Sequence, residues 1–359
     1  MHSPDVAHLR LVNQRIAGRH FSTPEEVVSW LGAVQAQDYP SARWAVGLRM
    51  KAGTDDAVAR AYDEGRILRT HILRPTWHFV TREDIRWMLA LSAPQVRKAI
   101  TYYGRQIGID ETLFQRSNEI IARALKGRHL TRKELAAILK DNGIDASGMR
   151  AGVFMSRAEV EGTVCSGPMR GKQFTYALLD ERVPQSAPLT REESLAALAK
   201  RYFDSHGPAT LDDFVWWSGL NQKDARTGLS RLNPAPRPQV VDGRVHWFPR
   251  TAKAGAKSIA RAYLLPIYDA YSVGYTDRSA LFDATRMERP AAARPQSLFW
   301  NMIIINGRMV GTWRRTIEKG RVHIDINAVG GLTAGETRAI TDAAKEYGSF
   351  VDLPVVLEL

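Results

Sequence analysis

The stretch ILRTHILRPTWHFV (residues 67–80) has the β-branched and aromatic composition of a β-hairpin, with Arg74-Pro75 at its turn or edge. Helices followed by a hairpin are the element order of a winged helix, a common DNA-binding unit. The N-terminal part of the chain is therefore predicted to be a winged helix. The helical patterns that precede the hairpin are residues 9–17, a helix from Thr23, residues 41–48 and a helix from Thr54 to before Gly65.

The helix after Thr23 has the clearest signals. Thr23 occupies the N-cap position, and Glu26 follows three residues later, as a capping box requires. Pro40 disfavours helical backbone at the residue before it. We therefore expect this helix to end near residues 35–37.

The same element order returns twice downstream. Helical patterns at 130–143 and 147–161 precede two predicted strands within residues 162–179. A third set of helices begins at Leu189 and ends with PQVVDGRVHWF (238–248), where Asp242-Gly243 is a strong hairpin turn signal. The chain is therefore predicted to contain three tandem winged helices.

From residue 262 onward the pattern favours strands, followed by a helix at 334–347 and a last strand at 353–359. This predicts a C-terminal β-barrel with a capping helix, so the expected fold class is α+β. Residues 284–295, rich in Ala, Arg and Pro, are expected to form an exposed loop. The predicted domains are 1–127, 128–187, 188–255 and 256–359.

Composition limits the classes of function. Among the 359 residues, 50 Lys and Arg oppose 38 Asp and Glu, a formal net charge of +12 that favours a polyanionic partner. Cys165 is the one cysteine, which excludes an intramolecular disulfide and a cysteine-rich zinc site. No apolar run approaches the ~20 residues of a membrane span, and the N-terminus is too polar for a signal peptide. We expect a cytoplasmic protein with no membrane partner.

Motifs for metal and nucleotide chemistry are missing from the sequence. It contains no Walker spacing, no GxGxxG and no His-Glu-x-x-His. His71 and His78 fall near one another on the first hairpin, but the sequence shows no carboxylate partner for them. We therefore predict neither a metal nor a cofactor.

The most informative polar cluster is Gln35-Ala36-Gln37-Asp38, just before Tyr39-Pro40. One interpretation is a solvated helix end, as polar residues commonly form. On a continuing helix the two glutamines would point to nearly opposite faces. If the helix unwinds before Pro40, both side chains can converge on one cavity.

Three stretches resemble the AlkZ-like family of bacterial DNA glycosylases: WLGAVQAQDYPSARWAVGLR (30–49), THILRPTWHFV (70–80) and YLLPIYDAYSVGYTDRS (263–279). The resemblance covers nearly the whole chain in order. It implies three winged helices and a β-barrel around a DNA channel. It also implies hydrolysis of the N-glycosidic bond of alkylated purines, including those in interstrand crosslinks. The family's catalytic signature, Gln-aliphatic-Gln or Asp, is matched by Gln35, Ala36 and Gln37, although Ala36 is smaller than the usual middle residue.

This chemistry suits uncharged side chains. A purine alkylated at ring nitrogen 7 is already cationic and leaves easily, so the enzyme mainly has to place a water molecule. We predict that Gln37 positions the water and that Gln35 orients it or holds the sugar-phosphate. Asp38 is the competing residue, either as a base or electrostatic stabiliser, or simply as a cap of the local backbone.

Other residues are weaker candidates. Asn13 is expected to line the same cavity or a solvated helix face, and Asp269 and Tyr271 to approach the lesion or to make structural hydrogen bonds. The expected partner is double-stranded DNA carrying alkylated or crosslinked purines, bound by a monomer. The predicted DNA-binding residues are Arg74, His71, His78, Arg150, Arg157, Arg170, Lys172, Arg314 and Arg315.

No lysine is placed as a Schiff-base nucleophile, so the predicted enzyme is a monofunctional DNA glycosylase. Three winged helices are also ordinary parts of transcription regulators. A winged-helix regulator that reads one operator is therefore the alternative hypothesis.

Overall fold

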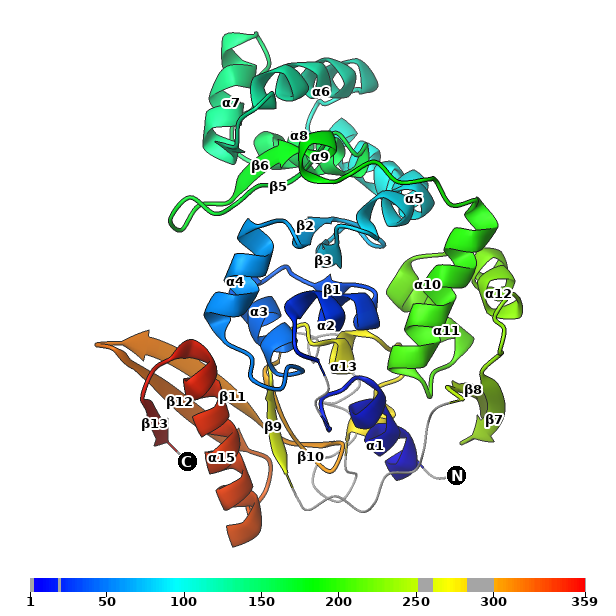
Figure 1. Cartoon of the computed structure of the whole chain (residues 1–359), viewed down its shortest axis with the longest axis vertical. Helices are drawn as coiled ribbons and strands as arrows, with labels where there is room; N and C mark the ends of the chain where they lie inside the picture. The colour runs from blue at the N-terminus through cyan, green and yellow to red at the C-terminus, as the bar shows by residue number, and fades with distance from the viewer. Residues whose placement is uncertain (1–2, 19–20, 251–260, 283–299, 359) are drawn as a thin grey trace.

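The computed structural model describes residues 3–18, 21–250, 261–282 and 300–358. The first hairpin lies near the centre of the molecule and is one part of a three-stranded sheet of order β1-β3-β2 (Figure 1). In the predicted hairpin, His71 pairs with Trp77 and Ile67 pairs with Thr81. These pairs confirm the two predicted strands of the hairpin. The elements of this first unit are α1 (Ser3–Asn13), α2 (Pro24–Leu31), β1 (Val34–Gln35), α3 (Tyr39–Gly47), α4 (Asp55–Asp63), β2 (Ile67–His71) and β3 (Trp77–Thr81).

The helix after Thr23 begins as predicted, with both hydrogen bonds of the capping box present. The prediction that it continues to residues 35–37 is wrong. It ends at Leu31, because Gly32 takes a left-handed backbone with φ of 79° that favours glycine. The chain then enters β1, where Gln35 pairs with His78 of β3.

Two helices that the sequence pattern does not predict, α5 (Ile85–Gln106) and α6 (Glu111–Leu125), complete the first unit, and the second unit follows them. The predicted helices follow as α7 (Arg132–Asp141) and α8 (Arg150–Val160). The expected pair of strands is also confirmed, and the short strand β4 extends it into a sheet of order β4-β6-β5. These strands are β4 (Leu130–Thr131), β5 (Val164–Ser166) and β6 (Thr175–Leu178), and the short helix α9 (Leu179–Arg182) ends the unit.

The third unit matches its predicted elements closely. Asp242 and Gly243 both have positive φ, of 47° and 76°, as the expected hairpin turn requires. Figure 1 shows this unit beside the central sheet. Its elements are α10 (Arg191–His206), α11 (Leu211–Ser218), α12 (Gln222–Ser230), β7 (Arg237–Val241) and β8 (Arg244–Phe248).

The predicted C-terminal barrel is wrong. In the described part of the chain the last strands form an open five-stranded sheet of order β13-β12-β11-β10-β9, so that β13 and β9 are its edges. The sheet buries its apolar side chains against α15 and the first unit instead of closing on itself. The elements are β9 (Ala262–Leu265), α13 (Ala270–Val273), the 3-10 helix η1 (Ser279–Leu281), β10 (Met302–Ile305), β11 (Arg308–Glu318), β12 (Arg321–Ala328), α15 (Ala334–Val351) and β13 (Val355–Glu358).

Only the start of the run 263–279 is a strand. Asp269 accepts a hydrogen bond from the Tyr271 N–H at 2.9 Å and caps α13, so the chain turns into a short helix there. The loop predicted at 284–295 lies outside the described residues.

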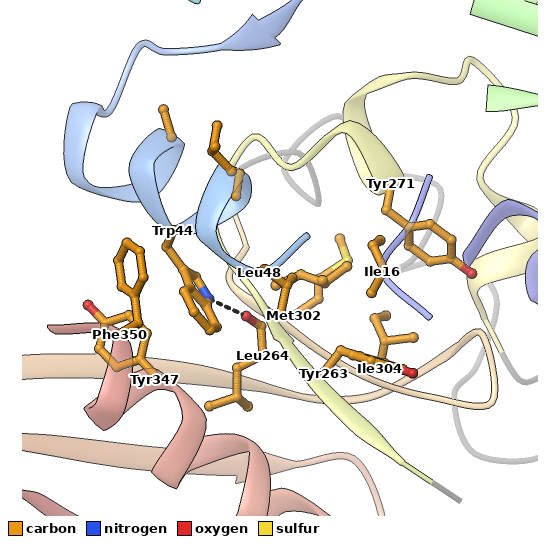
Figure 2. Packing of buried hydrophobic residues seen from close by; sticks show 14 of the residues in the cluster. Ile16, Trp44, Leu48, Tyr263, Leu264, Tyr271, Met302, Ile304, Tyr347 and Phe350 are labelled. Carbon is orange, nitrogen blue, oxygen red and sulfur yellow. Dashed lines mark hydrogen bonds between the residues drawn. The ribbon is translucent and has the colours of Figure 1, made fainter. Parts of the chain in front are cut away.

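The first and last parts of the chain share one hydrophobic core. The Trp44 Nε1 donates to the Leu264 carbonyl at 2.7 Å, and the Trp44 ring packs against Tyr347 and Phe350 of α15 (Figure 2). Burial of these large aromatic side chains holds the C-terminal sheet against α3. None of the described helices is long and apolar enough to span a membrane.

Candidate functional site

The two glutamines lie at an exposed edge of the central sheet. The extended backbone continues past β1, since the Ala36 N–H donates to the Trp77 carbonyl at 2.7 Å. Side chains two residues apart on extended backbone share a face. Gln35 is half-buried, Ala36 is buried and Gln37 is exposed, as this alternation requires. Gln35 therefore lies in a strand and Gln37 at the bend that follows it, and neither residue belongs to an unwound helix end.

Each glutamine carbonyl has a different environment. Arg74 Nη2 donates to Gln35 Oε1 at 3.1 Å. Gln37 Oε1 lies 3.5 Å from the Trp77 N–H, which is too long for a strong hydrogen bond. Among the described residues, neither glutamine NH2 group has a protein acceptor. Gln37 Oε1 and both NH2 groups are therefore available to a ligand or a water molecule.

Ala36 fixes the backbone between the glutamines. Its carbonyl accepts a hydrogen bond from Arg69 Nε at 2.9 Å. The Arg69 guanidinium lies 4.3 Å from the Trp77 ring centroid and 4.6 Å from that of Phe174. Burial lowers the pKa of Arg69, but the arginine stays a cation at neutral pH and keeps donating.

Asp38 caps the next helix. Its Oδ1 accepts a hydrogen bond from the Ser41 N–H at 2.9 Å, and the side chain is exposed. Tyr268 lies close enough that burial and the Asp38 charge both raise the pKa of its phenol. Tyr268 has a φ of 63°, which is rare for a bulky side chain and is typical of functional sites. It is not among the predicted site residues, although it adjoins the predicted Asp269.

A second group of residues meets Arg74 on the side of Gln35. Trp216 of α11 is 38 % exposed, whereas its neighbour Trp217 is 2 % exposed. The guanidinium carbons of Arg74 and Arg278 lie 5.4 and 6.0 Å from the Trp216 ring centroid. Burial, and then the charge of Arg278, lower the pKa of Arg74 to about 10. The sequence pattern marks Arg74 alone, because nothing local separates Trp216 from Trp217.

The two hairpin histidines lie in the interior. Burial, and then the charge of Arg74, lower the pKa of His78 to about 3, so it is neutral at pH 7. The expectation that His71 lacks a carboxylate partner is wrong, because its Nδ1 hydrogen-bonds Glu159 of α8. His71 Nε2 lies 3.3 Å from Ser156 Oγ. This contact links β2 to α8. In the described ranges, no three His, Cys, Asp or Glu side chains gather as metal ligands would.

The three weaker candidates make buried structural contacts between distant parts of the chain. Asn13 Nδ2 donates to the Gly207 carbonyl at 2.6 Å. Asp269 forms a bidentate ion pair with Arg49 at 2.8 and 2.9 Å, and both side chains are fully buried. The Tyr271 hydroxyl lies 2.9 Å from the carbonyls of Ala7 and Gly307. All three side chains lie inside the protein, away from solvent.

The predicted phosphate-binding cations differ in exposure. Arg157 is 3 % exposed and pairs with Glu111 and Glu161, so it faces the interior of its unit. Arg150 donates to the Ile107 and Asp145 carbonyls.

The remaining cations lie nearer the surface. Arg170 is exposed but pairs with Glu134 at 2.8 Å. Arg315 donates to the Tyr347 hydroxyl at 2.6 Å, whereas Lys172 and Arg314 are exposed. Of the predicted cations, only Arg74 contacts the glutamine pair directly.

A strongly basic α+β protein with polar and cationic side chains at an exposed sheet edge has features typical of proteins that bind nucleic acid. Comparison with known proteins identifies its family. The sequence model of the family described as DNA glycosylase AlkZ-like matches residues 28–350, and the chain belongs to this family. It is a DNA glycosylase, an enzyme that hydrolyses N-glycosidic bonds, and the regulator hypothesis is not favoured.

Two further comparisons, one of sequence and one of fold, each give a match from Streptomyces sahachiroi. The sequence is 25 % identical over 320 residues to an interstrand DNA cross-link repair glycosylase, covering 85 % of each chain. The fold matches that of the solved DNA glycosylase AlkZ with a TM-score of 0.81, at 22 % identity and with 99 % of both chains covered. The fold is thus shared over its whole length.

Proposed function

We propose that this glycosylase releases purines alkylated at a ring nitrogen from DNA, including purines joined in interstrand crosslinks. The observation that carries the proposal is the pair of uncharged amides of Gln35 and Gln37 at an exposed edge. A cationic alkylpurine departs without protonation, so the enzyme needs a placed water more than an acid. The relative named for crosslink repair supports the same substrate class.

The geometry suggests separate roles for the two amides. Gln37 Oε1 is only weakly engaged by the Trp77 N–H, so it accepts a hydrogen bond from the attacking water. Gln35 is oriented by Arg74, which occupies its carbonyl and leaves the NH2 group to bind the sugar-phosphate or the water. Holding the water near the anomeric carbon removes much of the entropic cost of the reaction.

The exposure of the site suits a tethered substrate. A crosslinked guanine is bonded to the opposite strand and cannot swing freely into a closed pocket. Gln37 and Asp38 are both exposed, so the duplex can approach them without complete extrusion of the base. This arrangement favours bulky lesions.

The three sets of helices and hairpins are proposed to be winged helices, and the protein is proposed to bind the duplex as a monomer. The proposed units are 1–127, 128–187 and 188–255, each with one winged helix, and the C-terminal unit 256–359. The exposed cations Lys172 and Arg314 are the proposed phosphate contacts outside the site. Chromosomal DNA as substrate places the enzyme in the cytoplasm. Arg157 is not part of the proposed surface, because its guanidinium is buried and paired.

Base release tests the proposal. Duplexes carrying 7-alkylguanine or a nitrogen-mustard crosslink are incubated with the enzyme and then treated with alkali, which cleaves at abasic sites. We expect strand scission with the natural protein and a loss of about 10²- to 10³-fold in rate for Gln37→Ala. Gln185→Ala, an exposed glutamine on a distant loop, is the matched control. Absence of scission with every lesion would refute the proposed function.

A further inference from the structure

Arg74 and Arg278 form a pair of neighbouring cations, and the charges of Asp213 and Asp277 act on Arg278 only from beyond salt-bridge distance. They come from distant parts of the chain, the loop between β2 and β3 and the segment after α13, and they meet at Trp216. Within the ranges that the structure describes, neither guanidinium has a carboxylate within 4.0 Å, and Arg74 Nε is buried without a hydrogen-bond partner. Two half-buried cations placed together repel each other, so this arrangement suits an anionic ligand.

The backbone holds this pair rigidly. Trp216 Nε1 donates to the Val273 carbonyl at 3.0 Å, and Arg278 Nε donates to the neighbouring Ser272 carbonyl at 2.9 Å. Arg74 is fixed through Nη2 by Gln35. Among the described residues, the terminal nitrogens of Arg278 have no hydrogen-bond acceptor and stay free to donate.

The loop that carries Arg74 also packs tightly on α11. Leu73 has a φ of 62°, and its carbonyl accepts from Gln95 Nε2 at 3.3 Å. A Cβ atom at Gly219, the residue that ends α11, would lie 2.5 Å from that carbonyl oxygen. Only a glycine permits this approach, so the loop and the Trp216 helix keep a fixed distance.

Trp216 lies beside both guanidiniums. Arginine stacks favourably on an indole ring, and planar stacking leaves the edges of the guanidinium free to donate. Trp216 is partly exposed and Arg74 contacts Gln35, so this group adjoins the glutamines near the surface.

We propose that Arg74 and Arg278, which both lie beside Trp216, bind one phosphodiester of the lesion-bearing strand immediately beside the scissile nucleoside. Arginine binds phosphate oxygens with paired, charge-assisted hydrogen bonds. Because Arg74 also holds Gln35, the bound phosphate sets the position of the sugar relative to the two amides. The inference rests on the proposed function and adds the contact that aligns its substrate.

Neutral phosphate analogues test this site without base release. The probe is a duplex with a stable tetrahydrofuran abasic site, in which each flanking phosphate is replaced in turn by an uncharged methylphosphonate. We expect one position to weaken binding of the natural protein by about tenfold, and Arg278→Gln to weaken binding of the unmodified probe equally. At that position the two changes together should weaken binding no further than either alone.

Salt dependence and matched variants complete the test. Arg278→Gln should lower the slope of log Kd against log salt by about one, whereas Lys345→Gln on α15 should leave the slope unchanged. Trp216→Phe keeps an aromatic ring beside the cations and should bind better than Trp216→Ala. The inference is overturned if Arg278→Gln and methylphosphonate losses add at every position. If binding behaves as expected but no lesion is released, the proposed function fails and the phosphate site stands.

Discussion

Asp269→Asn is expected to destabilise the protein strongly while sparing its chemistry. Asparagine keeps the shape of the side chain and the oxygen that caps the Tyr271 N–H. It removes the negative charge, so the Arg49 guanidinium is left in the interior without its bidentate partner. Both side chains are 0 % exposed, so water cannot replace the lost charge.

Breaking such a buried pair costs about 3–5 kcal/mol, a large part of the roughly 5–15 kcal/mol that stabilises a typical protein. The melting temperature of the enzyme should therefore fall by about 10 °C. Asp325→Asn removes an exposed carboxylate from β12 and should shift the free energy of unfolding by less than about 0.5 kcal/mol.

Thermal unfolding followed by circular dichroism measures the melting temperature, and base release is then assayed well below both transitions. We expect the folded Asp269→Asn enzyme to release alkylated bases at close to the natural rate. A melting temperature within about 2 °C of that of the natural protein would refute the structural role of Asp269. Loss of activity in the fully folded variant would also refute it and would indicate that Asp269 contacts the lesion.

Gln35→Ala should lower base release by about tenfold or more. Because Gln35 and Arg74 act as one unit, replacing both should cost less than the product of the two single losses, and single-turnover rates of the three variants test this. Asp38→Asn keeps a good N-cap, so both stability and base release should stay close to natural values, and a loss of about 10²-fold would instead assign the water to Asp38. Burial lowers the pKa values of His78 and His206 to about 3 each, so both bind protons only after unfolding. The free energy of unfolding should therefore fall as the pH drops below about 6.5 and keep falling toward pH 3, by up to about 1.4 kcal/mol per pH unit for each histidine; urea unfolding at stepped pH measures the slope, and His78→Gln should reduce it.

Short-range signals explain the elements that the sequence predicts well. The Thr23 and Glu26 capping box and the Asp242-Gly243 turn depend on hydrogen bonds and backbone angles within three residues. The helix end before Gln35 is different. Gly32 stops that helix early, and the strand that follows exists only because β3, about forty positions later, supplies its hydrogen bonds. A two-residue strand has no periodicity of its own to detect.

The open C-terminal sheet shows the same limit. The alternation and helical spacing of apolar residues predict its strands and its final helix. Whether the sheet closes into a barrel is not a local property. Trp44 and the aromatic side chains of α15 bury one face of the sheet, so the edges need not meet (Figure 2). Packing between residues more than 200 positions apart determines this outcome.

The sequence predicts one part of the candidate site, and only the tertiary structure decides the other part. Composition indicates a basic protein, and the resemblance to the AlkZ-like family marks Gln35 and Gln37 as its candidate amides, because charge and side-chain chemistry belong to each residue wherever it lies. Which residues surround those amides is a matter of three-dimensional packing. In the folded protein Arg157 and Asp269 are buried, whereas Trp216 is partly exposed. Arg278 and Arg74 are far apart in the sequence, and only folding brings them together at Trp216. Contacts between distant segments follow from how the whole chain buries its apolar surface, which no stretch of sequence records by itself.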